Sequence, residues 1–159
     1  MFSVRSTIIT LINIVLLTII FTTYASAATV AMDFGNIDMV IERIDDGPSS
    51  SYPYYISINI PTNTNEGIFV ENSVDVSSGT IPQMFLKQLN LITREGEVDV
   101  YGWIDTDQIV SIYQWLKNID NGYGELTFIR EGRFTHYPIT IQNHQTKAEA
   151  IAKLLLCVN

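Results

Sequence analysis

Alternation of apolar and polar residues is the feature that most limits how this chain can fold. In residues 54–60 every second position is an isoleucine, and residues 97–104 repeat the alternation with valine and isoleucine. A period of two is typical of a strand that buries one face. The same pattern recurs in three further segments, residues 29–44, 67–76 and 125–141. The chain is therefore predicted to form a sheet of several strands.

Turn sequences between these strands predict hairpins. Glu131-Gly132 interrupts residues 125–141, and Gly35-Asn36 interrupts residues 29–44 as a two-residue turn or a bulge. Pro138 has no backbone N–H to donate, so the strand that contains it is expected at an edge of the sheet. Because hairpins join antiparallel strands, most of the pairing is expected to be antiparallel.

Residues 105–116 change to the period of a helix. Their apolar residues fall on one helical face, at Ile109, Ile112, Tyr113 and Leu116. Asp105 suits the N-cap and Gln108 suits the third helical position, which is the arrangement of a capping box. This helix would directly follow the strand of residues 97–104.

Two further helices are expected. Pro82 fits the first turn of a helix over residues 82–92, and a hairpin around Glu95-Gly96 is the alternative. The C-terminal segment predicts a helix with Thr146 and Glu149 as its capping box. Its buried stripe is expected at Ile151, Leu154, Leu155 and Val158. The order of elements predicts an α+β fold, a mostly antiparallel sheet with about three helices packed on one face.

Residues 1–27 are predicted to be a cleaved secretory signal peptide. Arg5 precedes an almost wholly apolar run from Ile8 to Phe21, and Ala25-Ser26-Ala27 matches an A-x-A cleavage site. An uncleaved anchor is the alternative, but the run is shorter than the roughly 20 residues that a spanning helix needs. We therefore expect an exported chain, periplasmic or extracellular, without stable membrane insertion, in which residues 28–159 form a single α+β domain.

Composition narrows the classes of fold and partner. Of the 159 residues, 47% are hydrophobic and 16% are charged, which suits an ordinary core. Cys157 is the only cysteine, so no internal disulfide is expected, and its role is predicted to be that of a small buried hydrophobe. The formal net charge of −8 disfavours nucleic acid, because binding phosphates requires Lys and Arg. A basic protein or a neutral sugar is compatible with this charge.

Residues with catalytic or metal-binding chemistry are present without a known motif. Asp99, Asp105 and Asp107 could hold a divalent cation, but the residues that follow break the spacing of a calcium loop. The alternative is that Asp105 caps the helix, Asp107 interacts with the helix dipole and Asp99 lies on a solvated strand face. His136 and His144 lack the additional ligands of a metal site. We predict no catalytic residue, no metal and no cofactor.

Aromatic residues provide the candidate binding site. Tyr and Trp are enriched in binding hot spots because they offer a large contact area at low entropic cost. Two such residues follow each other in the strand of residues 54–60, and two lie on the face of residues 97–104 that is opposite Val98. If the helices cover the Val98 face, the second face is free to meet a partner; packing in the core is the alternative. The candidate binding residues are Tyr54, Tyr55, Asp99, Tyr101 and Trp103.

These features favour a non-enzymatic exported binding protein, such as an inhibitor, an immunity-type protein that neutralises a toxin, or an assembly factor of the cell envelope. The expected partner is another protein, and the charge favours a basic one. One alternative is an exported hydrolase of envelope polymers that uses some of Asp99, Asp105, Asp107 and His136. The other is a carbohydrate-binding module in which Tyr101 and Trp103 stack on sugars.

Overall fold

A computed structural model of the chain describes residues 29–44, 51–62, 68–79, 83–119, 123–140 and 142–156. These residues form one eight-stranded sheet and two helices. In chain order the elements are β1 (Thr29–Asp33), β2 (Asp38–Arg43), β3 (Tyr54–Pro61), β4 (Phe69–Ser78), β5 (Phe85–Arg94), β6 (Glu97–Ile104), α2 (Thr106–Asn118), β7 (Tyr123–Arg130), β8 (Arg133–Thr140) and α3 (His144–Leu156). The predicted signal peptide over residues 1–27 and Cys157 lie outside the described residues.

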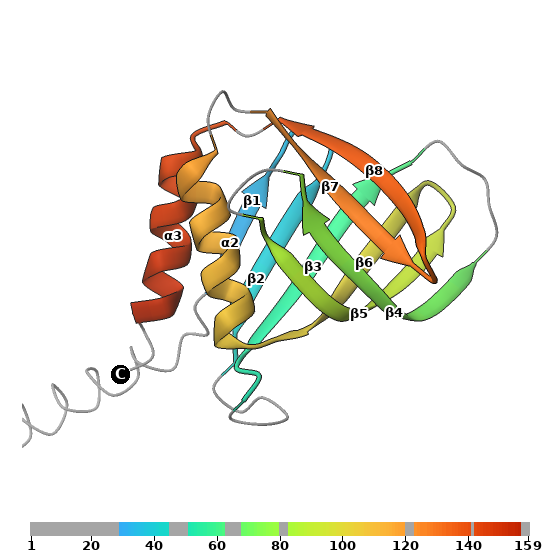
Figure 1. Cartoon of the computed structure of the whole chain (residues 1–159), viewed down its shortest axis with the longest axis horizontal. Coiled ribbons are helices and arrows are strands. Elements are labelled where there is room, and N and C mark those ends of the chain that lie inside the picture. The colour runs from blue at the N-terminus through green and yellow to red at the C-terminus, as the bar shows by residue number, and fades with distance from the viewer. Residues whose placement is uncertain are drawn as a thin grey trace, which may run out of the picture.

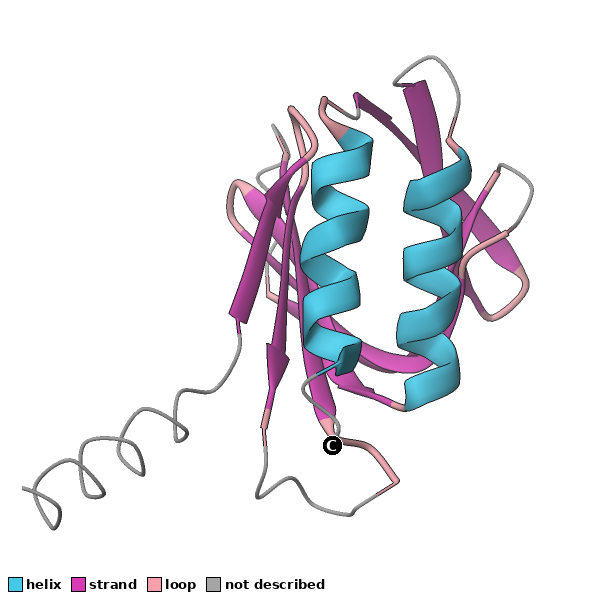
Figure 2. Ribbon diagram, turned by 90° about the vertical axis from the view of Figure 1, so that its left-hand side faces the viewer, coloured by secondary structure: helices cyan, strands magenta, loops and turns pink. Residues whose placement is uncertain are grey.

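The sheet is antiparallel at every strand pair and runs in the order β1-β2-β3-β6-β5-β4-β7-β8. It curls into a half-barrel (Figure 1). The helices α2 and α3 lie side by side across the open side of the curl (Figure 2). Pro138 lies in β8 at one end of the strand order, so the predicted edge position is confirmed. Within the described ranges, neither helix has the length and apolar character required to cross a bilayer.

The predicted arrangement of about three helices packed on one face of a sheet is wrong. Residues 82–92 were the expected first helix, but β5 occupies most of this segment and pairs with both β4 and β6. The alternative, a hairpin around Glu95-Gly96, is the structure that forms. The described residues therefore make a strand-rich half-barrel that carries two helices.

A β-bulge explains this error. On β5, Lys87 and Gln88 together lie opposite the single residue Asp75 of β4, and Gln88 adopts a φ of +57°. The extra residue separates the buried Leu86 and Leu89 by three positions instead of two. A spacing of three is also what one face of a helix requires, so the bulge conceals the strand in the sequence.

The two helices agree with the sequence pattern to different degrees. Asp105 accepts a hydrogen bond from the Gln108 N–H at 2.8 Å, and the Gln108 side chain accepts one from the Asp105 N–H at 3.1 Å, so the predicted capping box is confirmed. The last helix begins at His144, which places Thr146 in the first turn and not at the N-cap as predicted. The helices bury Ile109, Ile112, Trp115 and Leu116 from α2, and Ala148, Ile151 and Leu154 from α3.

The two ends of the curled sheet meet at Phe34, in the turn between β1 and β2. The Phe34 carbonyl accepts a hydrogen bond of 3.1 Å from the Thr140 N–H at the end of β8. The Phe34 ring is fully buried, and its centroid lies 5.9 Å from that of Trp115 of α2. From α3, the Lys147 ammonium group lies 4.2 Å from the same ring centroid and donates to the Asp33 carbonyl. Both sheet edges and both helices are thus joined at one place.

A glycine allows β6 to pass close to the bulged part of β5. A Cβ atom added at Gly102 would lie 2.9 Å from Cδ2 of Leu89, a side chain that is fully buried. Real Cβ contacts are longer than this, so either Leu89 or the strand would have to move. Position 102 therefore requires a residue without a side chain.

We expect Gly102→Ala to lower the free energy of unfolding by about 1–3 kcal/mol, the usual cost of overpacking a core. Gly79→Ala is the matched control, because its Cβ would meet nothing closer than a Glu125 side-chain atom at 3.8 Å, and we expect it to change stability by less than about 0.5 kcal/mol. Urea unfolding of both variants and the parent measures the difference. Equal stability of the two variants would contradict this account of Gly102.

Candidate binding surface and adjoining pocket

The alternation of β3 and β6 separates an inner and an outer face of the sheet. Tyr54 is fully buried on the inner face, whereas Tyr55 is partly exposed on the outer face. In β6 the valines and the isoleucine are buried, and Tyr101 and Trp103 lie on the other face, so the predicted division of this strand is confirmed. Tyr54 therefore belongs to the core, and Tyr55, Asp99, Tyr101 and Trp103 share the outer face.

Three aromatic side chains group on this outer face, with Tyr55 in contact with the other two, and we call Tyr55, Tyr101 and Trp103 the aromatic cluster. Tyr55 lies directly opposite Trp103 in the strand register, with ring centroids 5.3 Å apart and an interplanar angle of 72°. Tyr101 is its diagonal neighbour, with centroids 6.5 Å apart. Edge-to-face contacts of this kind contribute about 0.5–1.5 kcal/mol beyond the area they bury. The three rings therefore hold one another in a fixed arrangement.

The aromatic cluster lies in an acidic environment. Burial raises the pKa of the Tyr55 hydroxyl, and Tyr101, Glu42 and Asp99 raise it further by electrostatic repulsion of the phenolate. The carboxylates of Glu42 and Asp99 therefore lie close enough to Tyr55, at neighbouring positions of the sheet, to raise its pKa. A neutral Tyr55 hydroxyl remains a hydrogen-bond donor at the edge of the aromatic surface.

Asp99 is held by two partners and forms the polar border of the cluster. Its Oδ1 accepts a hydrogen bond of 2.6 Å from Asn59 Nδ2, and its Oδ2 lies 3.4 Å from the Arg94 guanidinium. Asn59 and Arg94 also donate to Glu97, at 3.2 and 3.3 Å. Because both Asp99 oxygens are engaged, this carboxylate orders the surface and is a poor candidate for a free catalytic base.

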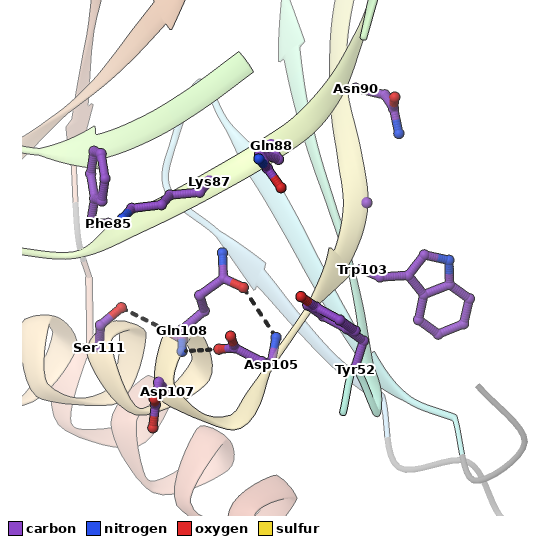
Figure 3. A pocket seen from close by; sticks show the side chains of 11 residues that line it. Tyr52, Phe85, Lys87, Gln88, Asn90, Trp103, Asp105, Asp107, Gln108 and Ser111 are labelled. Atoms are coloured by element: carbon purple, nitrogen blue, oxygen red, sulfur yellow. Dashed lines mark hydrogen bonds between the residues drawn. The ribbon is translucent and has the colours of Figure 1, made fainter. Parts of the chain in front are cut away.

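A pocket of about 660 Å³ adjoins the cluster at Trp103 (Figure 3). It forms where β5 and β6 separate: their pairing ends at Asn90 opposite Tyr101, whereas β6 remains paired with β3 as far as Ile104. The first turn of α2 closes the far side of the opening. The lining comes from four parts of the chain, namely Tyr52, then Phe85, Lys87, Gln88 and Asn90 of β5, Gly102 and Trp103 of β6, and Asp105, Asp107, Gln108 and Ser111 at the start of α2.

The capping box orients one polar group of this pocket. Gln108 Oε1 must accept the hydrogen bond from the Asp105 N–H, so its Nε2 is directed away from the helix and toward β5 (Figure 3). Ser111 Oγ donates to the Gln108 carbonyl at 2.7 Å and stabilises the same turn. Opposite them, the Lys87 ammonium group lies 5.3 Å from the Phe85 ring centroid. The pocket thus contains pre-oriented donors beside the ring of Tyr52.

The structure does not bring the proposed hydrolytic residues together. Asp105 is six residues beyond Asp99, which corresponds to roughly 20 Å along an extended strand, and glycosidase carboxylates lie within about 10 Å of each other. Asp105 also uses one carboxylate oxygen as a helix cap. Asp107 lies two residues from Asp105 on the rim of the pocket. His136 of β8 is four strand positions from β6 in the sheet order, or roughly 19 Å when followed along the sheet at the usual strand spacing.

His136 has a local environment of its own. Its Nδ1 lies 2.8 Å from Glu125 Oε1 and 3.1 Å from Thr127 Oγ1, and both neighbours belong to β7. A hydrolytic triad needs the acid and the nucleophile at different ring nitrogens, whereas here both meet Nδ1. His144 is the first residue of α3. Across the described ranges, no three His, Cys, Asp or Glu side chains lie close enough together to hold a metal ion.

The pocket contains residues that the sequence analysis did not select. Lys87 and Gln88 were assigned to a predicted helix and Tyr52 was not selected, so nothing connected these residues with Trp103. Gln108 was recognised only as a capping residue. The signal that could have led to the pocket is this capping box, because a long side chain that reaches back to the N-cap presents its other end away from the helix.

No known protein family, curated protein sequence or solved structure matches this chain. Its function must therefore be argued from the aromatic cluster and the pocket themselves.

Replacing the cap residue tests whether Asp105 has a structural role. We expect Asp105→Ala to lower the free energy of unfolding by about 1 kcal/mol, because the Gln108 N–H loses its acceptor. Asp107→Ala is the control, since Asp107 is exposed and contributes through the helix dipole alone, by about 0.3–1 kcal/mol. Thermal melts of both variants beside the parent give the comparison. An Asp105→Ala variant as stable as the parent would show that the carboxylate has another role.

The raised pKa of Tyr55 predicts a loss of stability in alkali. The pKa of Tyr55 in the folded chain lies above the ordinary tyrosine value of 10.0, so the unfolded chain releases this proton first as the pH rises. The group therefore leaves stability unchanged well below pH 10.0 and lowers it as the pH passes above that value. We expect Tyr55→Phe to lose less stability than the parent between about pH 9 and about pH 11, as measured by urea unfolding. Parallel stability profiles would contradict the assignment.

Proposed function

We propose that this chain is an exported, non-enzymatic binding protein that docks on another protein through the aromatic cluster. The observation that carries the proposal is that Tyr55 packs against both Tyr101 and Trp103 on the outer face of β3 and β6, opposite the face that packs in the core. An inhibitor, an immunity-type protein and an envelope assembly factor all fit this kind of surface. Export to the periplasm or the cell exterior remains a prediction from the N-terminal sequence.

The arrangement of the cluster supports docking in two ways. Its rings are preorganised by their mutual contacts, so little side-chain entropy is lost when a partner covers them. A polar border formed by Asn59, Arg94, Glu97 and Asp99 adjoins the apolar cluster at one end, like part of the polar rim of a protein interface. The cluster is thus suited to act as the centre of such an interface.

The charge distribution indicates what kind of protein would bind. Glu42, Glu97 and Asp99 lie on the outer face near the cluster, where Arg94 is paired with Glu97 and Asp99. The whole chain has a formal net charge of −8. A basic partner would be attracted by both features, and its association rate would fall as salt rises.

The hydrolase alternative receives less support from the same geometry. Asp99 is held by Asn59 and Arg94, Asp105 caps a helix and His136 lies in a different part of the sheet. A catalytic site would have to assemble these groups around one reacting atom. Binding through the aromatic cluster requires no such rearrangement, because its rings already lie together.

The proposal is tested by capturing partners from the producing cell with the tagged chain and then comparing two variants. Tyr55→Thr/Tyr101→Thr removes two rings and keeps β-forming residues. Phe134→Thr is the control, because Phe134 is an aromatic residue with 62% exposure on the edge strand β8. We expect the control to retain the partner and the double variant to lose at least about tenfold in affinity, as for hot-spot residues.

A second measurement examines the charge. Stopped-flow association of the captured protein should slow as the ionic strength rises. Retention of every captured protein by the double variant, or an association rate that is independent of salt, would refute docking through this face. Neither variant alters a side chain that lines the pocket beside Trp103.

A further inference from the structure

The pocket beside Trp103 has several features of a small-molecule binding site. Two irregularities of the sheet create it: the separation of β5 from β6 beyond Asn90, and the bulge of Lys87 and Gln88 on β5. Bulges redirect side chains and are common next to functional sites. Both bulged residues line the pocket. Its volume of about 660 Å³ is within the usual range for small-molecule sites.

The bulge is strained and is supported by a dedicated contact. Gln88 has a left-handed backbone with a φ of +57°, a conformation that costs a residue with a side chain roughly 1–2 kcal/mol. Its N–H donates a hydrogen bond of 2.8 Å to Asp75 Oδ1 on β4, which replaces the ladder partner lost at the bulge. Strain that persists under such support is a reason to look for a function at the strained residue.

The chemistry of the lining favours a neutral ligand rich in hydroxyl groups. Gln108 Nε2 and Lys87 Nζ supply donors, and the amides of Gln88 and Asn90 supply both donors and acceptors. Tyr52 provides a ring inside the opening, and Trp103 provides one at the outer rim, where its ring points away from Gln108 (Figure 3). Aromatic faces carry negative potential and attract the weakly positive C–H face of a sugar ring.

The mixed charges in the pocket disfavour a ligand that carries charge of one sign only. Asp105 and Asp107 at the start of α2 would repel a phosphate or a carboxylate, and Lys87 across the pocket would repel an amine. A neutral saccharide faces neither penalty. We propose that this pocket binds one or two rings of a neutral saccharide, with Gln108 Nε2 donating to a sugar oxygen. This site is additional to the docking surface described above.

The most direct test is Gln108→Glu. A glutamate at this position keeps an oxygen to accept the Asp105 N–H, so the capping box and the melting temperature should be preserved. The substitution replaces the donor that points into the pocket with a negatively charged carboxylate oxygen, which can no longer donate to a sugar oxygen. We expect the full chain to bind chitotriose, cellotriose or maltotriose with a Kd of the order of 1 mM or tighter, and Gln108→Glu to weaken this about tenfold. Isothermal titration calorimetry measures both.

Gln88→Gly provides a second variant in which loss of folding cannot explain loss of binding. Glycine relieves the left-handed strain, so this variant should be at least as stable as the parent. It removes an amide from the pocket, and we expect weaker saccharide binding. The control is Phe134→Thr, which changes an exposed aromatic residue of β8, leaves both the pocket lining and the support of Trp103 intact and should bind the saccharide like the parent.

Three results would overturn the proposal. One is the absence of binding by all three neutral trisaccharides at concentrations of about 10 mM. Another is equal binding by the parent, Gln108→Glu and Gln88→Gly. The last is tighter binding of an acidic sugar, such as trigalacturonate, which would contradict the choice of a neutral ligand. Because the docking surface is tested with other variants, failure of either proposal is distinguishable from failure of the other.

Discussion

The hydrogen bond between Thr140 and Phe34 joins the two ends of a sheet that would otherwise stay open, and the rest of the fold depends on this closure. It brings the end of β8 to the turn that follows β1, although these segments are at opposite ends of the strand order. The buried Phe34 ring then meets Trp115 from α2 and Lys147 from α3. A single aromatic residue thus fixes the curvature of the sheet and the position of both helices.

This closure determines which surface is available for binding. Since the helices lie across the open side of the curl, the inner face of β3 and β6 is buried, and the outer face must be compatible with water or a partner (Figure 2). The aromatic cluster occupies that outer face. The pocket begins where the ladder between β5 and β6 ends. Trp103 belongs to the aromatic cluster and to the pocket, because at this position β6 is still paired with β3 but no longer with β5.

Local patterns in the sequence predict those parts of the fold that local forces determine. The alternation of β6 gives the correct faces for Tyr101 and Trp103, and the residues of the capping box locate the start of α2. The bulge at Gln88 depends on a carboxylate from another strand, Asp75, which no local pattern reveals. The same is true of the contact between Phe34 and Thr140. The pocket was missed because it requires both long-range features.

The left-handed positions of the chain show why the bulge is informative. Glycine occupies three of them, Gly35, Gly96 and Gly132, where it adopts this backbone without steric cost. Glu131 lies in the β7–β8 turn and Asn143 directly precedes α3, positions where a tight reversal or a helix boundary accounts for the conformation. Gln88 alone among the described left-handed residues lies within a strand. A glycine at position 88 would relieve the strain of the bulge, but it would remove the amide side chain from the pocket. The strained backbone at Gln88 is therefore the consequence of keeping this amide in the lining.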